Sequence, residues 1–243
     1  MKIVDAVWEM RNLGVATCEV TFDAQDALES IAATHDELFP KYEYLVFRVP
    51  CNRSDIALIL QSKGCSFIET AVTLQNDLKN IFVDGKYKPL CDKCSWELMN
   101  DKDLAQLYDE IRAGIFQTDR IYLDPYFSKA VAANRYVFWT QDLVAQNCLP
   151  HKIIFGNKVI GFFLDKAQDD GSTKGLLAGI YHDFLKTGLG FLVQYAGFAR
   201  AKSVNAPYRT LNVSSNNLPV IKINLELGAK ISNLEYIFIK HRN

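Results

Sequence analysis

Two closely spaced glycines, Gly188 and Gly190, could bind a phosphate group. They follow an apolar run at residues 176–181 and precede a helical pattern at residues 191–203. Glycine lets the backbone turn sharply and lets a ligand approach it closely. The first amides of a helix have no partner within the helix, so they attract an anion. The spacing fits a pyrophosphate site, and it also fits an ordinary tight turn between a strand and a helix.

The elements around this turn would hold it in place. Lys186 adds a cation beside it, a second strand is predicted over residues 208–214, and a helix begins after Asn217 and ends at Gly228. The resulting order is strand, phosphate-binding turn, helix, strand, helix. We therefore expect the ligand site to be built from residues 176–228.

The rest of the chain supplies further helices and strands. We predict helices at 24–38 (with Asp23 as N-cap), 54–64, 104–114 (with Asp101 as N-cap) and 127–147, and strands at 44–49, 67–74, 151–155, 159–164 and 234–240. A polar stretch at residues 76–89 is the expected linker. This order predicts an α/β (α+β) chain in which helices cover a mixed sheet.

An internal similarity links the two ends of the chain. Residues 44–74 align with residues 208–238 without a gap when they are shifted by 164 positions. The shared positions include Tyr44 with Tyr208 and Gly64 with Gly228. Either a duplicated unit or the common patterning of a strand-helix-strand segment accounts for this similarity.

The composition indicates a globular protein and argues against several partners. The 243 residues are 49% hydrophobic and 23% charged, and the net charge is −1. Such a balance does not favour nucleic acid or an anionic membrane surface as a partner. The N-terminus does not have the pattern of a signal peptide. The six cysteines lie mostly in apolar contexts, which indicates reduced thiols and a cytoplasmic protein.

Cys91 and Cys94 form a single Cys-x-x-Cys pair. A zinc site needs further ligands, and no second cysteine pair or histidine pair follows. We therefore expect no metal.

Residues 180–190 resemble the acyl-CoA-binding motif of the GNAT superfamily of N-acyltransferases, Gln/Arg-x-x-Gly-x-Gly/Ala. Residues 217–229 resemble the later motif of that superfamily, Asn-x-x-Ala-x-x-x-Tyr-x-x-x-Gly-Phe. The motifs occur in the superfamily's order, and the resemblance covers residues 95–243. Residues 48–70 and 119–125 are most similar to the TDP-fucosamine acetyltransferase group. That group implies a GNAT-like splayed sheet, with residues 1–80 as a partial copy of the fold and residues 95–243 as the catalytic domain.

The resemblance implies that acetyl-CoA is a cosubstrate and that a nucleotide-linked amino sugar attacks it directly. It implies that the cofactor is bound by Gly179, Ile180, Leu185, Lys186, Thr187, Gly188, Leu189, Gly190 and Asn217, with Ser214 beside the gap in the sheet. A different small amine, such as an antibiotic or an amino acid, is an alternative acceptor. A non-catalytic acyl-CoA-binding module is a second alternative, and a homodimer is left open.

Two residues depart from the superfamily pattern. Leu185 replaces the Gln or Arg of the first motif, which leaves the backbone contacts to phosphate in place. Asn224 replaces the Tyr that would protonate the departing thiolate, and an amide cannot donate such a proton. His182 is a candidate base because its ordinary pKa suits that role, and a surface histidine in a turn is the alternative.

The acceptor side is expected on the segment 119–125 and on the helix that follows. Candidate acceptor ligands are Asp119, Arg120, Tyr122, Asp124, Tyr136 and Trp139. The carboxylates would bind hydroxyls or the amine, and Arg120 would bind phosphate. Tyr136 and Trp139 would either stack on the acceptor or pack in the core.

Overall fold

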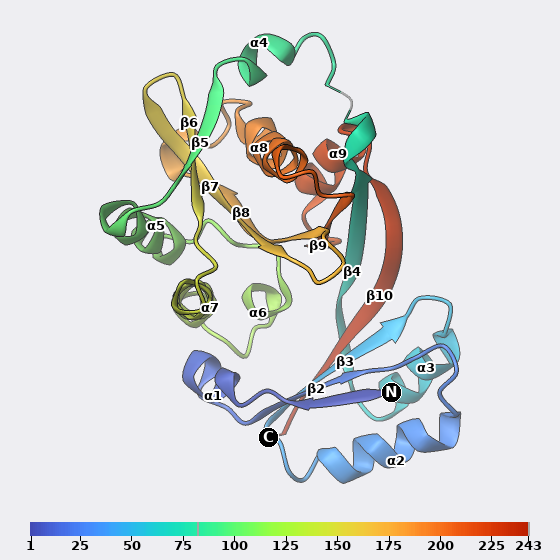
Figure 1. The fold of residues 1–243 in the computed structure, drawn as a ribbon. Helices are drawn as coiled ribbons and strands as arrows, with labels where there is room; N and C mark the ends of the chain where they lie inside the picture. The colour runs from blue at the N-terminus through green and yellow to red at the C-terminus, as the bar shows by residue number, and fades with distance from the viewer. Residues whose placement is uncertain (82, 243) are drawn as a thin grey trace.

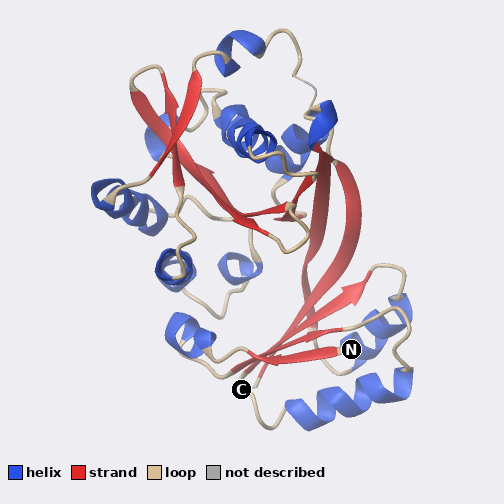
Figure 2. Cartoon of the chain, in the orientation of Figure 1, coloured by secondary structure: helices blue, strands red, loops and turns tan. Residues whose placement is uncertain are grey.

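The computed structural model describes residues 1–81 and 83–242 and contains one large mixed sheet with helices on both faces (Figures 1 and 2). The strands are β1 (Lys2–Asp5), β2 (Thr17–Thr21), β3 (Tyr44–Pro50), β4 (Ser66–Asp77), β5 (Cys94–Leu98), β6 (His151–Phe155), β7 (Lys158–Ala167), β8 (Thr173–Ile180), β9 (Tyr208–Ser214) and β10 (Lys230–His241). Their order across the sheet is β1-β2-β3-β10-β4-β9-β8-β7-β6-β5. The expected fold class, a mixed α/β sheet flanked by helices, is confirmed.

The helices connect these strands and cover them. They are α1 (Trp8–Leu13), α2 (Leu28–Leu38), α3 (Ser54–Ser62), α4 (Lys88–Cys91), α5 (Asp101–Arg112), α6 (Arg120–Leu123), α7 (Lys129–Ala145), α8 (Gly190–Ser203) and α9 (Leu218–Glu226), with short 3₁₀ turns at Leu78–Asn80 and His182–Phe184. Apolar clusters place α2, α3, α8 and α9 on one face of the sheet and α1, α5, α6 and α7 on the other.

Several predicted boundaries were wrong, each for a local reason. Asp23 does not cap a helix, because its carboxylate binds the N-terminal ammonium of Met1 at 2.6 Å, and α2 begins at Leu28. Helix α5 is capped by Asn100, whose side chain accepts from the amide of Asp103, rather than by Asp101. The segment 119–125, for which no helix was predicted, contains the helical turn α6.

The internal similarity is repeated in the structure. Strand β3, helix α3 and strand β4 correspond to β9, α9 and β10 with the same offset of 164 positions at every boundary. Gly64 and Gly228, which follow the two helices, both have positive φ, 75° and 91°. A left-handed residue after a helix is a common way to end it, and glycine adopts that conformation without strain. The chain therefore contains two copies of one strand-helix-strand unit.

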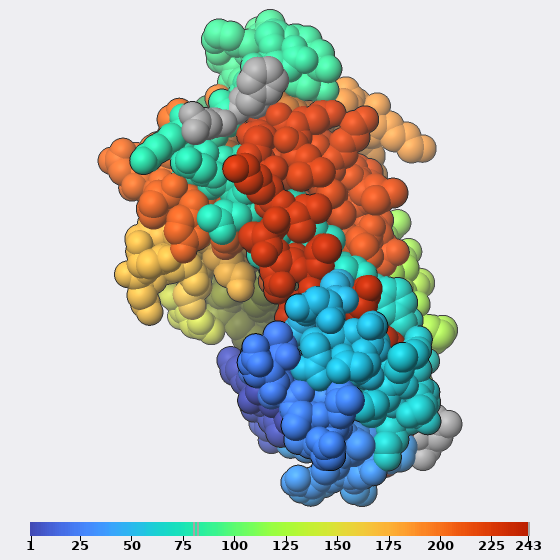
Figure 3. All heavy atoms as spheres, turned by 90° about the vertical axis from the view of Figure 1, so that its right-hand side faces the viewer, coloured from blue at the N-terminus to red at the C-terminus, as the bar shows by residue number. Residues whose placement is uncertain are grey.

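The two copies exchange their last strands. Strand β3 pairs with β10 of the second copy, and β9 pairs with β4 of the first copy. The registers match as well, since Val49 lies opposite Tyr236 and the equivalent Val213 lies opposite Val72. Figure 3 shows the blue and cyan N-terminal residues in contact with the red C-terminal ones. Because β4 and β10 join both halves into one sheet, the division into regions 1–80 and 95–243 stays a prediction.

Candidate active site

The neighbouring strands β8 and β9 separate after a short parallel pairing. The two strands pair only at Thr173–Gly175 of β8 and Arg209–Leu211 of β9. Their remaining residues are not paired with each other. Strands β2 and β3, which are parallel neighbours connected through α2 as β8 and β9 are connected through α8, pair over the full length of Thr17–Thr21. The sheet therefore opens in the second copy and stays closed in the first, within the residues that the structure describes.

A cavity of about 840 Å³ occupies this opening. Its wall includes Gln194, Asn217 and Val220 from the α8 and α9 face of the sheet, and Tyr136 and Trp139 from the α7 face. The cavity is also lined by residues 176–178 of β8 and 211–214 of β9, on the two sides of the gap. Such a volume is within the range of small-molecule sites. The cavity thus connects the two faces of the sheet through the gap between β8 and β9.

A buried ion pair lies where the strands begin to separate. The guanidinium of Arg209 donates to the carboxylate of Asp165 at 2.7 and 3.0 Å, and both side chains are buried. A Cβ added to Gly175 or Gly197 would lie 2.5 or 2.7 Å from Arg209 Nη2, so both positions need glycine. This packing ties β7, β8, β9 and α8 together at the closed end of the gap.

The glycine turn lies at the start of α8, as expected. Lys186 and Gly188 have positive φ, 63° and 81°. The amides of Gly188 and Gly190 have no hydrogen-bond partner in the described part of the chain. The preceding residue, Leu189, caps the helix without a side-chain hydrogen bond. The turn therefore offers free N–H groups at a helix N-terminus, which is an arrangement that binds anions.

The other predicted cofactor residues lie around the gap. Asn217 lines the cavity and caps α9, where its side chain accepts from the amide of Val220 at 3.4 Å. Ser214 also lines the cavity. Gly179 and Ile180 belong to β8, and they pair with β7 on the edge of β8 that faces away from β9. The cavity wall includes neither these two residues nor residues 185–190.

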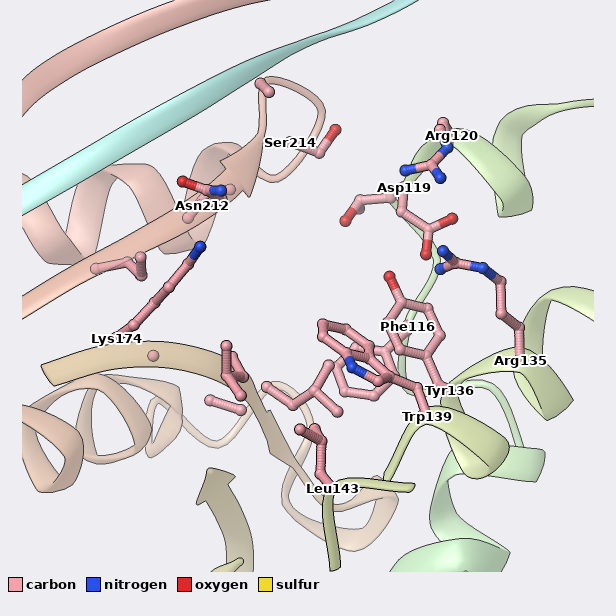
Figure 4. Close-up of a pocket in the computed structure, with 18 of the residues that line it drawn as sticks. Phe116, Asp119, Arg120, Arg135, Tyr136, Trp139, Leu143, Lys174, Asn212 and Ser214 are labelled. Carbon is pink, nitrogen blue, oxygen red and sulfur yellow. The ribbon is translucent and has the colours of Figure 1, made fainter. Parts of the chain in front are cut away.

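The α7 side of the cavity contains charged and aromatic groups. Figure 4 shows Asp119, Arg120, Arg135 and Tyr136 gathered on one side, opposite Lys174, Asn212 and Ser214. Four of the predicted acceptor residues, Asp119, Arg120, Tyr136 and Trp139, line this side of the cavity. The ring centroids of Tyr136 and Trp139 lie 6.1 Å apart. Burial raises the pKa of Tyr136 well above its usual value, so its phenol keeps its proton.

The arginines of this wall already have partners. Arg135 binds both carboxylate oxygens of Glu9, with distances between 2.6 and 3.1 Å. Arg120 binds Glu19, and this contact lowers the pKa of Glu19. Asp119 caps α6 by accepting from the amides of Ile121 and Tyr122 at 2.8 Å. Each of Asp119 and Arg120 keeps one atom without a partner among the described residues, Oδ2 and Nε respectively.

Four further predicted site residues, besides Gly179, Ile180 and residues 185–190, lie outside the cavity wall. Tyr122 packs against the core, and the ammonium of Lys129 lies 3.8 Å from the centroid of its ring. Asp124 is buried against His241, with 2.7 Å between Oδ2 and Nε2. Asn224 is fully buried, and its amide donates to Val220 O at 2.7 Å and to Gln194 at 3.2 Å. His182 binds Glu110 at 2.8 Å, on the 3₁₀ turn after β8.

Sequence reasoning missed the contribution of the N-terminal region to the cavity. Trp8, Glu19, Arg48 and Glu69 all line it. They have no local motif. The internal repeat indicates two copies of a unit but does not show which strands pair, so it gave no signal for these four residues.

The cysteine pair lies away from the cavity. Cys91 is buried and Cys94 is half-buried, and burial raises the pKa of Cys94 to about 11. Among the described residues, no group of three or more His, Cys, Asp or Glu side chains is arranged to hold a metal ion. In the same residues, no helix is both long and apolar enough to cross a membrane.

A search against protein-family models found no match, and a search of curated proteins found none. Solved structures share the fold. A conserved protein of unknown function from Staphylococcus epidermidis has a TM-score of 0.65 and 12% identity, covering 94% of this chain and 85% of its own. A GCN5-related N-acetyltransferase from Kribbella flavida has a TM-score of 0.59 and 13% identity, covering 94% and 82%.

A third similar structure is the glucosamine N-acetyltransferase region of a fungal multi-domain β-N-acetylglucosaminidase. Its TM-score is 0.59 and its identity 11%, over 82% of this chain and 25% of that one. Identities this low establish the fold alone. The sheet that separates between β8 and β9 is therefore a GNAT-type sheet.

Proposed function

We propose that this protein transfers an acetyl group from acetyl-CoA to the amine of a small acceptor. The gap between β8 and β9 carries the proposal, because it leaves unpaired backbone groups on two parallel strands inside a cavity. An extended pantetheine arm can pair with such groups as a strand would. The free amides at Gly188 and Gly190 lie on the strand-to-helix connection that follows β8, where they can bind the pyrophosphate.

The reaction needs an acceptor amine on the opposite face of the sheet from α8. The cavity supplies aromatic surface there from Trp139 and Tyr136. Lys174, whose ammonium points toward the cavity beside Asn212 in Figure 4, offers a cation for an acceptor phosphate. Flat sugar faces pack on aromatic rings, and phosphates pair with ammonium groups.

The acceptor we propose is an amino sugar linked to a nucleotide, as in the TDP-fucosamine acetyltransferase group. The glucosamine N-acetyltransferase region with the same fold supports an amino sugar. A cytoplasmic location, expected from the cysteines, belongs to the same proposal.

A thiol-release assay tests this function. The protein is incubated with acetyl-CoA and separately with TDP-fucosamine, glucosamine, an aminoglycoside and lysine, and free CoA thiol is measured. Release that depends on TDP-fucosamine supports the full proposal. Release with a different amine supports the acetyl transfer and replaces the acceptor. No release with any of them contradicts the proposed catalysis.

A non-catalytic acyl-CoA-binding module is the second candidate, favoured by Asn224. Its amide is fully buried and bonded to Gln194 and Val220, so it cannot protonate a thiolate. Calorimetry separates the two candidates. Acetyl-CoA binding without thiol release would support the module, and loss of binding in Asn217→Ala but not in Asn216→Ala would place the cofactor beside Asn217, since Asn216 is exposed.

A further inference from the structure

Glu69 is a buried carboxylic acid that reaches the cavity from the first copy of the repeat. It lies on β4, two residues before Ala71, which pairs with Ser214 of β9. The neighbouring backbone holds this register, because Ser215 N donates to Thr70 O at 2.8 Å and Thr70 N donates to Ser215 Oγ at 3.0 Å. Glu69 therefore lines the cavity close to the end of β9, where the gap is open.

The carboxyl group of Glu69 lacks a complete set of partners. It is 8% exposed, and its Oε2 has no hydrogen-bond partner among the described residues. Glu19 pairs with Arg120, and Glu235 of β10 pairs with Arg48 at 3.4 Å. Asp119 Oδ2 also has no partner among the described residues, but its Oδ1 accepts from two amides of α6. An unpaired buried carboxyl group costs free energy, so its retention in a ligand cavity points to a role with the ligand.

The charges around Glu69 come from every neighbouring element. Burial raises its pKa, and Asp119 of the α6 cap adds to that rise. The Ser214 hydroxyl, Arg120 of α6 and Arg48 of β3 oppose it, and the net direction is upward. A carboxylate with a raised pKa is a stronger proton acceptor, and a general base works best when its pKa is near the working pH.

We propose that Glu69 is the general base that deprotonates the acceptor amine, a role that rests on the acetyl transfer proposed above. The carboxylate takes one proton from the acceptor ammonium. The neutral nitrogen then attacks the thioester carbon of acetyl-CoA and forms the C–N bond, and the C–S bond breaks. The second ammonium proton goes to the departing sulfur, which leaves as free thiol, and Glu69 releases its proton to solvent.

The dependence of kcat/KM on pH tests this role. Wild type, Glu69→Gln and Glu235→Gln are compared, with acetyl-CoA and the amine that gives thiol release. In Glu69→Gln we expect kcat/KM to fall about 100- to 10,000-fold and to rise with pH until the free amine deprotonates. Glu235→Gln removes a carboxylate from the same face of the adjacent strand, outside the cavity wall, and should lower kcat/KM far less than Glu69→Gln does. Glu69→Asp, which keeps the acid, should recover part of the rate.

Thermal denaturation shows whether the variant folds and whether the carboxyl titrates as inferred. The folded-state pKa of Glu69 is raised, so its contribution to stability is present below its unfolded pKa and is lost as pH rises through the folded pKa. Glu69→Gln does not titrate. Its melting temperature should therefore rise relative to that of wild type as the pH increases above the unfolded pKa of Glu69.

The outcomes separate this role from the proposed function. Thiol release by wild type together with an unchanged profile in Glu69→Gln would overturn the general-base role and leave the acetyl transfer standing. No thiol release by wild type with any amine would overturn both. A folded Glu69→Gln that binds acetyl-CoA as wild type does, with the reduced rate and altered profile, would support the base.

Discussion

Replacing Asp165 with asparagine should destabilise the fold at the closed end of the gap. The substitution removes the charge that compensates the guanidinium of Arg209, which is 1% exposed. Among the described residues Arg209 forms no second ion pair, and its Nη1 has no hydrogen-bond partner. Removing one member of a buried ion pair costs about 3–5 kcal/mol. For a chain of this size, each 1 kcal/mol lowers the melting temperature by about 2–4 °C, so we expect a decrease of about 6–20 °C.

Thermal and urea denaturation of Asp165→Asn and two further variants measure this loss. Asp170→Asn is the matched control, because Asp170 is an exposed residue of the nearby loop between β7 and β8. Its carboxylate accepts a hydrogen bond from the hydroxyl of Tyr208 of β9. It should lower the melting temperature far less. The double variant Asp165→Leu/Arg209→Met removes both charges and should recover most of the loss. A decrease of less than about 1 kcal/mol in Asp165→Asn would refute the role assigned to this ion pair.

Three further predictions concern the same region. Gly197→Ala should cost about 1–3 kcal/mol in chemical denaturation, because its Cβ would lie 2.7 Å from Arg209 Nη2. Gly85→Ala has open space around the new Cβ and should be close to neutral, so equal stabilities of the two variants would contradict this prediction. His182→Ala should leave the pH profile of kcat/KM unchanged, because His182 binds Glu110 outside the cavity wall. If the variant lost the decrease of kcat/KM at acidic pH, His182 would be the base instead. Asp170 should titrate by NMR with a pKa of about 2, because hydrogen bonds from Ser172 and Tyr208 stabilise its carboxylate. Its contribution to stability is therefore present above its unfolded pKa and is lost as the pH falls toward 2. Tyr208→Phe should raise that pKa, and an unchanged value would remove the hydrogen bond as the cause.

Much of the second half of the fold follows from local signals. Strand β9 and the helix α8 behind the glycine turn were predicted within a residue of their observed bounds, because apolar periodicity and glycine punctuation both mark them. The short elements α1 and β5 were missed. Too few residues form them for a period to be visible, and their packing depends on partners far away in the sequence.

The strand exchange was beyond local patterning. The offset of 164 positions indicated two copies, but nothing in either copy indicates that β4 pairs with β9 instead of remaining with β3. Pairing between strands is set by long-range packing, which a single sequence does not display. For the same reason Glu69, a cavity residue in the first copy, gave no signal as a site residue.

The candidate site shows a similar division. Tyr136, Trp139, Asp119 and Ser214 were predicted from the resemblance, and the structure brings them to one cavity. Asp124 was grouped with them because it is close in sequence, yet it is buried against His241 near the other end of the chain. Sequence proximity therefore located the acceptor wall and could not decide which of its side chains face the cavity.

A crystal structure of the protein with CoA bound tests the central claim most directly. We expect the pantetheine arm between residues 176–178 of β8 and 212–214 of β9, with the pyrophosphate at the amides of Gly188 and Gly190. The thiol should then lie in the cavity on the side of Ser214 and Glu69. CoA bound elsewhere, with the gap between β8 and β9 empty, would contradict the account.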